Sequence, residues 1–138
     1  MADGAAGALH KALIAALKAS ADVAAIVGPR VYDEPPQAAK PPYIRLGALE
    51  PRPLRTSCNA GERINFGLEA HSRPKSGRVE ATKMLEAIKL VLDGRPDVLT
   101  LPGWNVVAVD WLTQTTGRED DGETYLGIAA FEALIERA

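Results

Sequence analysis

Residues 63–71 read Arg-Ile-Asn-Phe-Gly-Leu-Glu-Ala-His, so apolar and polar side chains alternate along the segment. A period of two places the apolar side chains on one face of a strand and the polar side chains on the other. An antiparallel strand with one buried and one solvated face has this pattern. The segment therefore predicts a sheet with one wet face, and the elements on either side of it determine how that sheet is covered.

A hairpin is predicted after this strand. Residues 104–115 are rich in Val, Trp and Thr, and residues 124–135 alternate as a partner strand. The charged turn between them contains Asp121-Gly122. Asp-Gly between two such segments is a strong hairpin signal. The last third of the chain therefore adds two antiparallel strands to the sheet.

Before residue 63, the chain predicts one further main strand and then a loop. Residues 43–49 have the pattern of a strand, and residues 30–33 have that of a short additional edge strand. Pro51 and Pro53 are expected to end the main strand, because proline has no N–H to donate to a sheet. The segment of residues 51–61 is therefore interpreted as an exposed, mobile loop.

Two segments have the apolar spacing of helices, residues 5–20 and residues 78–93. A short extra helical turn is expected through Ile26, with Asp22 as its cap. The elements then follow the order α-β-β-α-β-β. This order predicts an α+β fold, an antiparallel sheet of about four main strands with both helices packed on one face.

Length, charge and composition exclude several classes of protein. The chain has 138 residues, the common size of a single domain, here residues 1–138. Its 16 Lys and Arg and 18 Asp and Glu give a net charge of −2, without the basic excess of a general nucleic-acid binder. Apolar runs are shorter than the roughly 18 residues that cross a membrane. The N-terminus has no secretory-signal pattern, so we expect a cytoplasmic protein.

No catalytic, cofactor-binding or metal site is predicted. Cys58 is the single cysteine, which excludes a disulfide within the chain and a Cys-rich zinc site. It is interpreted as a solvent-facing loop residue. His10 and His71 lie far apart in the sequence without spaced carboxylates beside them, so they make a poor metal site. The glycines do not match a phosphate-binding loop.

The turn of the predicted hairpin holds the densest group of carboxylates. These residues lack the alternating ligands and the bidentate Glu of a calcium loop, so the turn is interpreted as a solvated hairpin tip. The candidate contact residues at this tip are Arg118, Glu119, Asp120 and Asp121.

The segment of residues 51–61 is a second candidate contact surface. Arg52 and Arg55 form a modest basic patch with Arg63, suited to an acidic partner, and Leu54 could serve as an apolar anchor. A solvated loop without a partner is the alternative interpretation.

The far side of the second helix is a third candidate surface. Val79 and Leu90 lie opposite its main apolar stripe, among Lys83 and Glu86. A helix that is apolar on both sides is buried between two layers. The second layer is either the first helix of the same chain or another subunit.

Several short stretches, taken in order, resemble the tail-terminator, or tail-completion, proteins of long-tailed phages and phage-like gene transfer agents. The stretches are residues 8–17, 26–33 (Ile-Val-Gly-Pro-Arg-Val-Tyr-Asp), 41–47 (Pro-Pro-Tyr-Ile-Arg-Leu-Gly), 71–73 (His-Ser-Arg), 77–81 (Gly-Arg-Val-Glu-Ala) and 121–127 (Asp-Gly-Glu-Thr-Tyr-Leu-Gly). They mark turns and strand starts, so Pro42, Tyr43 and the Asp121-Gly122 turn are expected to shape the fold.

The resemblance implies a structural role without catalytic residues or cofactors. It implies small α+β subunits that close into a hexameric ring. Such a ring caps the finished tail tube, ends its polymerisation and contacts a head-side connector protein. The implied partners are other copies of the chain, the tail tube protein and that connector. No membrane or sequence-specific nucleic acid is implied, although DNA can pass through the lumen. The subunit is then expected in the host cytoplasm during assembly and afterwards at the head-proximal end of the tail.

Three alternatives remain open. The first is another connector ring of the head–tail machine, such as a head-closure or adaptor protein. The second is a small enzyme that uses Cys58 or the carboxylates of the hairpin tip, and the third is an intracellular α+β ligand-binding module. The mass in solution separates them, because a closed ring indicates assembly and a monomer with a filled pocket indicates the last two.

Overall fold

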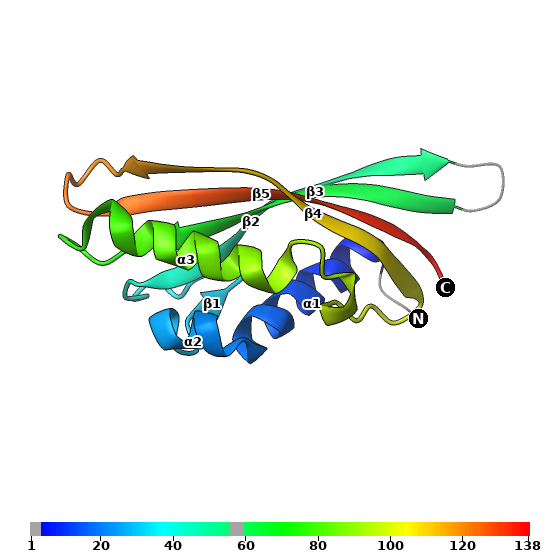
Figure 1. Cartoon of the computed structure of the whole chain (residues 1–138), viewed down its shortest axis with the longest axis horizontal. Coiled ribbons are helices and arrows are strands. Elements are labelled where there is room, and N and C mark those ends of the chain that lie inside the picture. The colour runs from blue at the N-terminus through cyan, green and yellow to red at the C-terminus, as the bar shows by residue number, and fades with distance from the viewer. Residues whose placement is uncertain (1–3, 56–59) are drawn as a thin grey trace.

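The computed structural model describes residues 4–55 and 60–138. Its helices are α1 (Ala5–Ala19), α2 (Ala21–Val27) and α3 (Gly77–Leu92), with a 3-10 turn, η1, at Pro96–Val98. Its strands are β1 (Val31–Tyr32), β2 (Tyr43–Arg55), β3 (Ala60–His71), β4 (Trp104–Arg118) and β5 (Tyr125–Arg137). The three helices lie on one side of the sheet (Figure 1). The predicted α+β fold with its helices on one face is confirmed.

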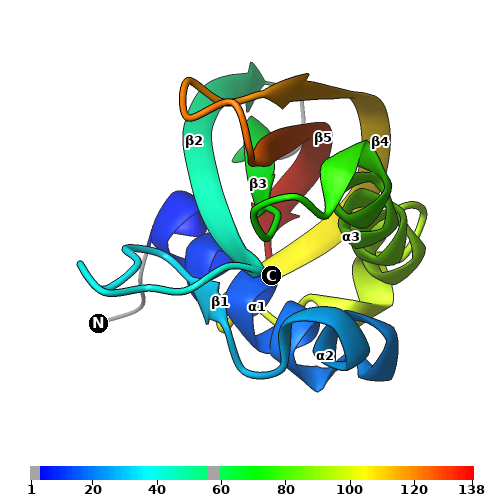
Figure 2. The same ribbon diagram turned by 90° about the vertical axis from the view of Figure 1, so that its left-hand side faces the viewer.

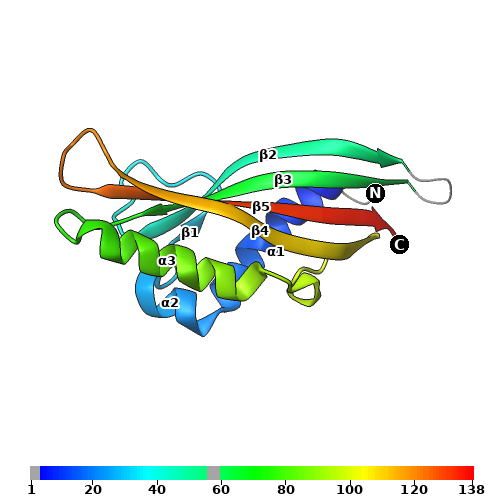
Figure 3. The same cartoon turned by 45° about the horizontal axis from the view of Figure 1, so that its top comes forward.

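The described strands form one sheet with the order β1-β2-β3-β5-β4. Each of the four long strands is antiparallel to its neighbours among them, and they follow one another in this order across the view of Figure 3. The two residues of β1 pair in parallel with β2, so the sheet is mixed, and the prediction of an antiparallel sheet is correct only for the four long strands. The strand predicted at residues 63–71 lies in β3, in the interior of the sheet.

The interpretation of residues 51–61 as a loop is wrong for residues 51–55 and 60–61, which lie in strands, and residues 56–59 lie outside the described residues. β2 continues through Pro51 and Pro53 to Arg55, whose Cα partner on β3 is Ala60. The prolines are tolerated because β1 covers β2 only at its start, so the remainder of β2 is a sheet edge where no N–H is needed on the outer side. Cys58 lies outside the described residues.

The short turn predicted before Gly28 is a full helix, α2, and its cap is not Asp22. The Ser20 side chain accepts a hydrogen bond of 3.3 Å from the backbone N–H of Val23, and Ser20 has an extended backbone. Asp22 instead lies in the first turn of α2, where its charge favours the helix dipole. Ser20 therefore ends α1 and begins α2, which lets the two helices share one corner of the core.

The core lies between the helices and the inner face of the sheet. Phe66 of β3 and Phe131 of β5 are Cα partners, and their rings stack with centroids 5.4 Å apart. The inner stripe of α3, which includes Met84, Leu85 and Ile88, is fully buried against them. Within the described residues, no helix combines the length and the apolarity that a membrane span requires.

Candidate functional site

The outward side of α3 carries two large apolar side chains that this chain leaves uncovered. Val79 is 64% exposed and Leu90 is 68% exposed, and Lys83 and Glu86 lie exposed between them. We call these four residues the α3 outer face. Although Ala16 and Ala19 of α1 line a hollow beside Leu90, both apolar side chains stay mostly exposed, so the possibility that the first helix covers these residues is wrong.

A groove between α2 and α3 begins at the N-terminal half of this face. It has a volume of about 480 Å³, and Val79 and Lys83 line it together with Ile26 of α2 and Arg30. A second hollow, of about 330 Å³, lies beside Leu90. The α3 outer face is therefore bordered by concave surface at both ends. We call the first hollow the α2–α3 groove.

The α2–α3 groove is positively charged. Its carboxylate, Glu80, is buried and engaged, because one oxygen lies 2.6 Å from Nη2 of Arg73 and the other accepts the Arg73 backbone N–H at 2.6 Å. Arg30 donates from Nε to the carbonyl oxygen of Pro42 at 2.8 Å. Among the described residues, neither Arg30 nor Lys83 has a carboxylate partner. Two cations of the groove are thus uncompensated.

The tip of the β4–β5 hairpin is held rigid by its own hydrogen bonds. Oδ1 of Asp121 accepts the backbone N–H groups of Glu123 at 2.8 Å and Thr124 at 2.9 Å. The Thr124 hydroxyl lies 2.7 Å from Asp121 Oδ2 and 2.8 Å from a Glu119 oxygen. The hydrogen bonds from Thr124 hold the pKa of Asp121 below its usual range. The carboxylates of Glu119 and Asp121 therefore order the turn itself.

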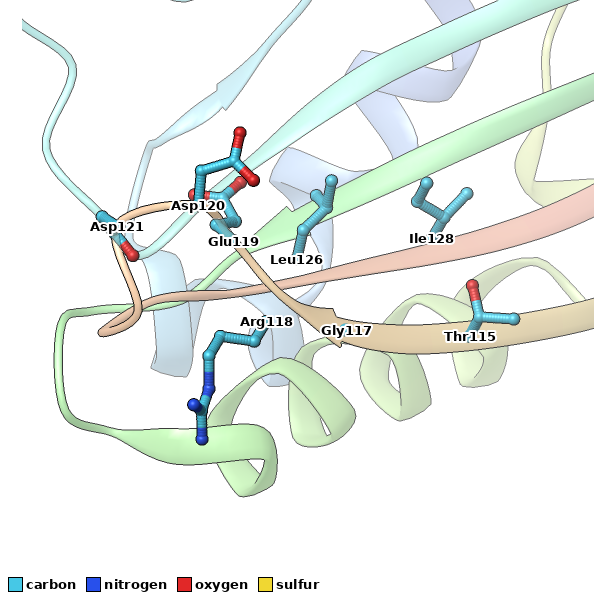
Figure 4. Close-up of a pocket in the computed structure, with 8 residues that line it drawn as sticks. All are labelled: Thr115, Gly117, Arg118, Glu119, Asp120, Asp121, Leu126 and Ile128. Atoms are coloured by element: carbon cyan, nitrogen blue, oxygen red, sulfur yellow. The ribbon is translucent and has the colours of Figure 1, made fainter.

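The remaining charges of the tip point outward in different directions. Asp120 and Glu123 are exposed, and their carboxylates have no cation partner in the described part of the chain. Arg118 extends toward the α3 side, and Glu119 and Asp120 lie on the other side, beside Leu126 and Ile128 (Figure 4). The hydrogen bond of 3.4 Å and the charge of Arg118 lower the pKa of the Tyr125 hydroxyl.

A cluster around His71, which the sequence did not indicate, anchors the tip to the sheet. His71 stacks on its Cα partner Tyr43 with ring centroids 4.5 Å apart. Its Nε2 lies 3.0 Å from Glu69, and its Nδ1 lies 3.5 Å from Glu119 of the tip. Burial, and then the charge of Glu119, raise the pKa of Tyr43. The register of β2 on β3 and the position of the β4–β5 tip bring these residues together, and no spacing within the sequence specifies either.

The candidate contacts in residues 51–61 lie on a strand. Arg52 faces Arg63 on β3, and its guanidinium lies 2.9 Å from the Glu50 carboxylate. Leu54 is half-buried, and Arg55 is the last residue of β2. Arg52 and Leu54 share the helix-free face of the sheet, because Arg52 is paired with the exposed Arg63 and Leu54 lies two positions further along the strand. They lie at the opposite end of the molecule from the β4–β5 tip (Figure 1).

The arrangement offers surfaces for assembly. Within the described ranges, no group of three His, Cys, Asp or Glu side chains could hold a metal ion. Instead, an uncovered helix face, a basic groove and an acidic hairpin tip lie near one end of the fold.

Comparison with known proteins agrees with this. A chain from the virion of a native gene transfer agent particle has the same fold, with a TM-score of 0.86 and 26% sequence identity over 97% of this chain and 99% of that chain. No curated protein sequence matches this chain. The family described as tail completion protein gp17 matches residues 11–136, which confirms the resemblance found in the short motifs. The chain therefore belongs to the tail completion protein gp17 family and is a structural tail protein, not an enzyme.

Proposed function

We propose that this chain is the subunit of a closed hexameric ring that caps the tail tube at its head-proximal end. The ring ends the polymerisation of the tube and joins it to a head-side connector protein, while DNA passes through the lumen. The subunits assemble in the host cytoplasm and remain in the tail of the particle. The family match over nearly the whole chain, together with the likeness to a chain of a gene transfer agent virion, supports this assignment.

The α3 outer face is the observation that supports a ring. Val79 and Leu90 are large exposed apolar side chains toward the two ends of one helix face, and each borders a hollow, which supports contact with a partner on this face. In a closed ring, each subunit contacts its two neighbours through two different patches of its surface. Because the ring closes, every such patch is covered. The α3 outer face, with Lys83 and Glu86 at its centre, is then one of the two patches.

The two ends of the elongated fold serve the two partners of the ring. The paired ends of β2 and β3, to which Arg52, Leu54 and Arg55 belong, lie at one end, and the β4–β5 tip lies at the other (Figure 1). We assign the β2–β3 end to the tail tube because its cations suit an acidic surface and Leu54 supplies an apolar contact. The opposite end then faces the head-side connector.

Deletion of the gene tests this function. Tails that lack the chain should grow to variable, excessive lengths, and supplying the chain should restore one length, as measured on electron micrographs. Tails of normal length that fail to join heads would instead support the alternative of a head-closure or adaptor ring. The mass of the purified chain, alone and bound to tails, reports whether a closed ring forms.

A further inference from the structure

We propose that the β4–β5 tip of each subunit docks into the α2–α3 groove of the next subunit in the ring. This inference rests on the proposed ring and specifies the two surfaces that join its subunits. The occupant of the groove is thus a second copy of this chain, and the contact runs head to tail around the ring.

The charges of the two surfaces are complementary. The groove presents Arg30 and Lys83, which have no carboxylate partner among the described residues. The tip presents Asp120 and Glu123, whose carboxylates have no cation partner in the same ranges. Two uncompensated cations on one surface therefore match two uncompensated anions on the other. Such complementarity fixes the register of a contact and disfavours wrong pairings.

The tip is also pre-organised for docking. Asp121 and Thr124 hold its backbone through their hydrogen bonds, so little conformational freedom remains to be lost when it binds. The backbone N–H of Lys75 donates to the carbonyl oxygen of Glu123 at 2.9 Å, which fixes the tip to the connection between β3 and α3. Its outward carboxylates are left for another molecule.

The positions of the two surfaces suit a closed ring. Both lie at the same end of the long axis, where the β4–β5 hairpin, α2 and the start of α3 are found (Figure 1). In the view down that axis, the hairpin lies at the top and α2 at the bottom (Figure 2). A rotation about an axis parallel to the long axis can therefore bring the tip of one subunit to the groove of the next. Repetition of this step uses a different patch on each side of every subunit, as closure requires.

Engineered disulfides test the contact in assembled particles. Lys83→Cys and Glu123→Cys are introduced together in a Cys58→Ser background, and particles are oxidised and run on a non-reducing gel. We expect a ladder of covalent oligomers, because every subunit would be linked to the next one. The matched control replaces Lys83→Cys by Asp97→Cys, which is also exposed and lies in η1 beyond the other end of α3. The control should give at least ten-fold less cross-linked product.

Each result decides the proposal. Bands that stop at the monomer or at the dimer overturn it, since a dimer would mean that two subunits contact each other reciprocally. Equal ladders from the test and the control also overturn it.

A charge exchange provides a second readout. Lys83→Glu alone should weaken ring formation at least ten-fold, and adding Asp120→Lys and Glu123→Lys should restore it, whereas failure of this rescue counts against the contact. If tails still end at one length and a ring is present, the proposed function stands even though this contact is wrong.

Discussion

Glu80 of α3 lies buried beneath Arg73, and its two carboxylate oxygens bind different parts of that residue. One accepts the backbone N–H of Arg73 at 2.6 Å, and the other lies 2.6 Å from the guanidinium Nη2. The Glu80 side chain is 10% exposed and that of Arg73 is 61% exposed. The pair therefore fixes the connection between β3 and α3 from below and leaves the guanidinium at the surface of the α2–α3 groove.

Glu80→Ala should destabilise the fold by about 1–3 kcal/mol, because the backbone N–H and the guanidinium of Arg73 both lose their charged acceptor. Urea unfolding measures this loss. Glu86→Ala, an exposed change on the same helix, is the matched control and should cost less than about 0.5 kcal/mol. Equal stability of the two variants would show that the Arg73–Glu80 pair does not hold the loop.

Gly61 should not tolerate a side chain, whereas Gly67 on the same strand should tolerate one. A Cβ atom at Gly61 would lie 2.7 Å from the carbonyl oxygen of Ile135, so Gly61→Ala must push β3 away from β5. We expect a loss of about 1–3 kcal/mol, the usual cost of overpacking. At Gly67 the nearest atom would lie 3.7 Å away, and Gly67→Ala should be neutral or stabilise by about 0.5–1 kcal/mol. Thermal unfolding of both variants checks the difference.

The sequence predicts this fold well where the pattern is local. The alternation at residues 63–71 identifies β3, and Asp121-Gly122 identifies the β4–β5 turn, because both depend on neighbouring residues. The end of β2 could not be predicted, since whether Pro51 and Pro53 break a strand depends on which side of that strand is unpaired. How much of β2 remains an unpaired edge of the sheet depends on the tertiary structure.

For the candidate surfaces too, the sequence predicts what is local and does not predict what depends on the tertiary structure. The periodicity of α3 identifies its outer face, but only the structure shows that α1 does not cover Val79 and Leu90. The His71 cluster requires the pairing of Tyr43 with His71 and the proximity of Glu119, which come from three separate elements. No spacing within one segment encodes such a site.

Hydrogen exchange should show that residues 51–55 are ordered before any partner binds. The amides of Arg52 and Leu54 alternate with the prolines, so we expect them to face β3 and to exchange slowly. The exposed amide of Asp120 at the other end of the sheet serves as a fast reference. Rapid exchange at Arg52 and Leu54 in the free protein would restore the interpretation of this segment as a mobile loop.

The carboxyl group of Asp121 should titrate below its usual range. Its pKa is lower in the folded chain than in the unfolded chain because the N–H of Thr124 donates to it. Its contribution to stability is therefore complete above the unfolded value of about 3.9, and it is lost as the pH falls through the lower, folded value. NMR titration of the side-chain carbon measures the pKa. Thr124→Val removes the hydroxyl hydrogen bond and should move the pKa of Asp121 upward, and an unchanged pKa would contradict this account.

Changing Val79 and Leu90 together to Glu should abolish the ring and leave the folded subunit intact. Both side chains are mostly exposed and α3 remains a regular helix, so the free energy of unfolding should change by less than about 0.5 kcal/mol per site. In a ring, however, the same change would bury two unpaired carboxylates in an apolar contact, which is costly. Urea unfolding measures the first effect, and the mass of the assembled protein measures the second.

Val107→Glu is the matched control for this pair of changes. Val107 is also an exposed valine, but it occupies a bulge of β4 outside the α3 outer face. It should leave both the fold and the ring unchanged. If the Val79 and Leu90 variant still forms a ring, α3 is not a subunit contact. If Val107→Glu disrupts assembly and the α3 variant does not, the contact between subunits runs along the edge of the sheet, where an unpaired strand offers its backbone groups to a neighbour.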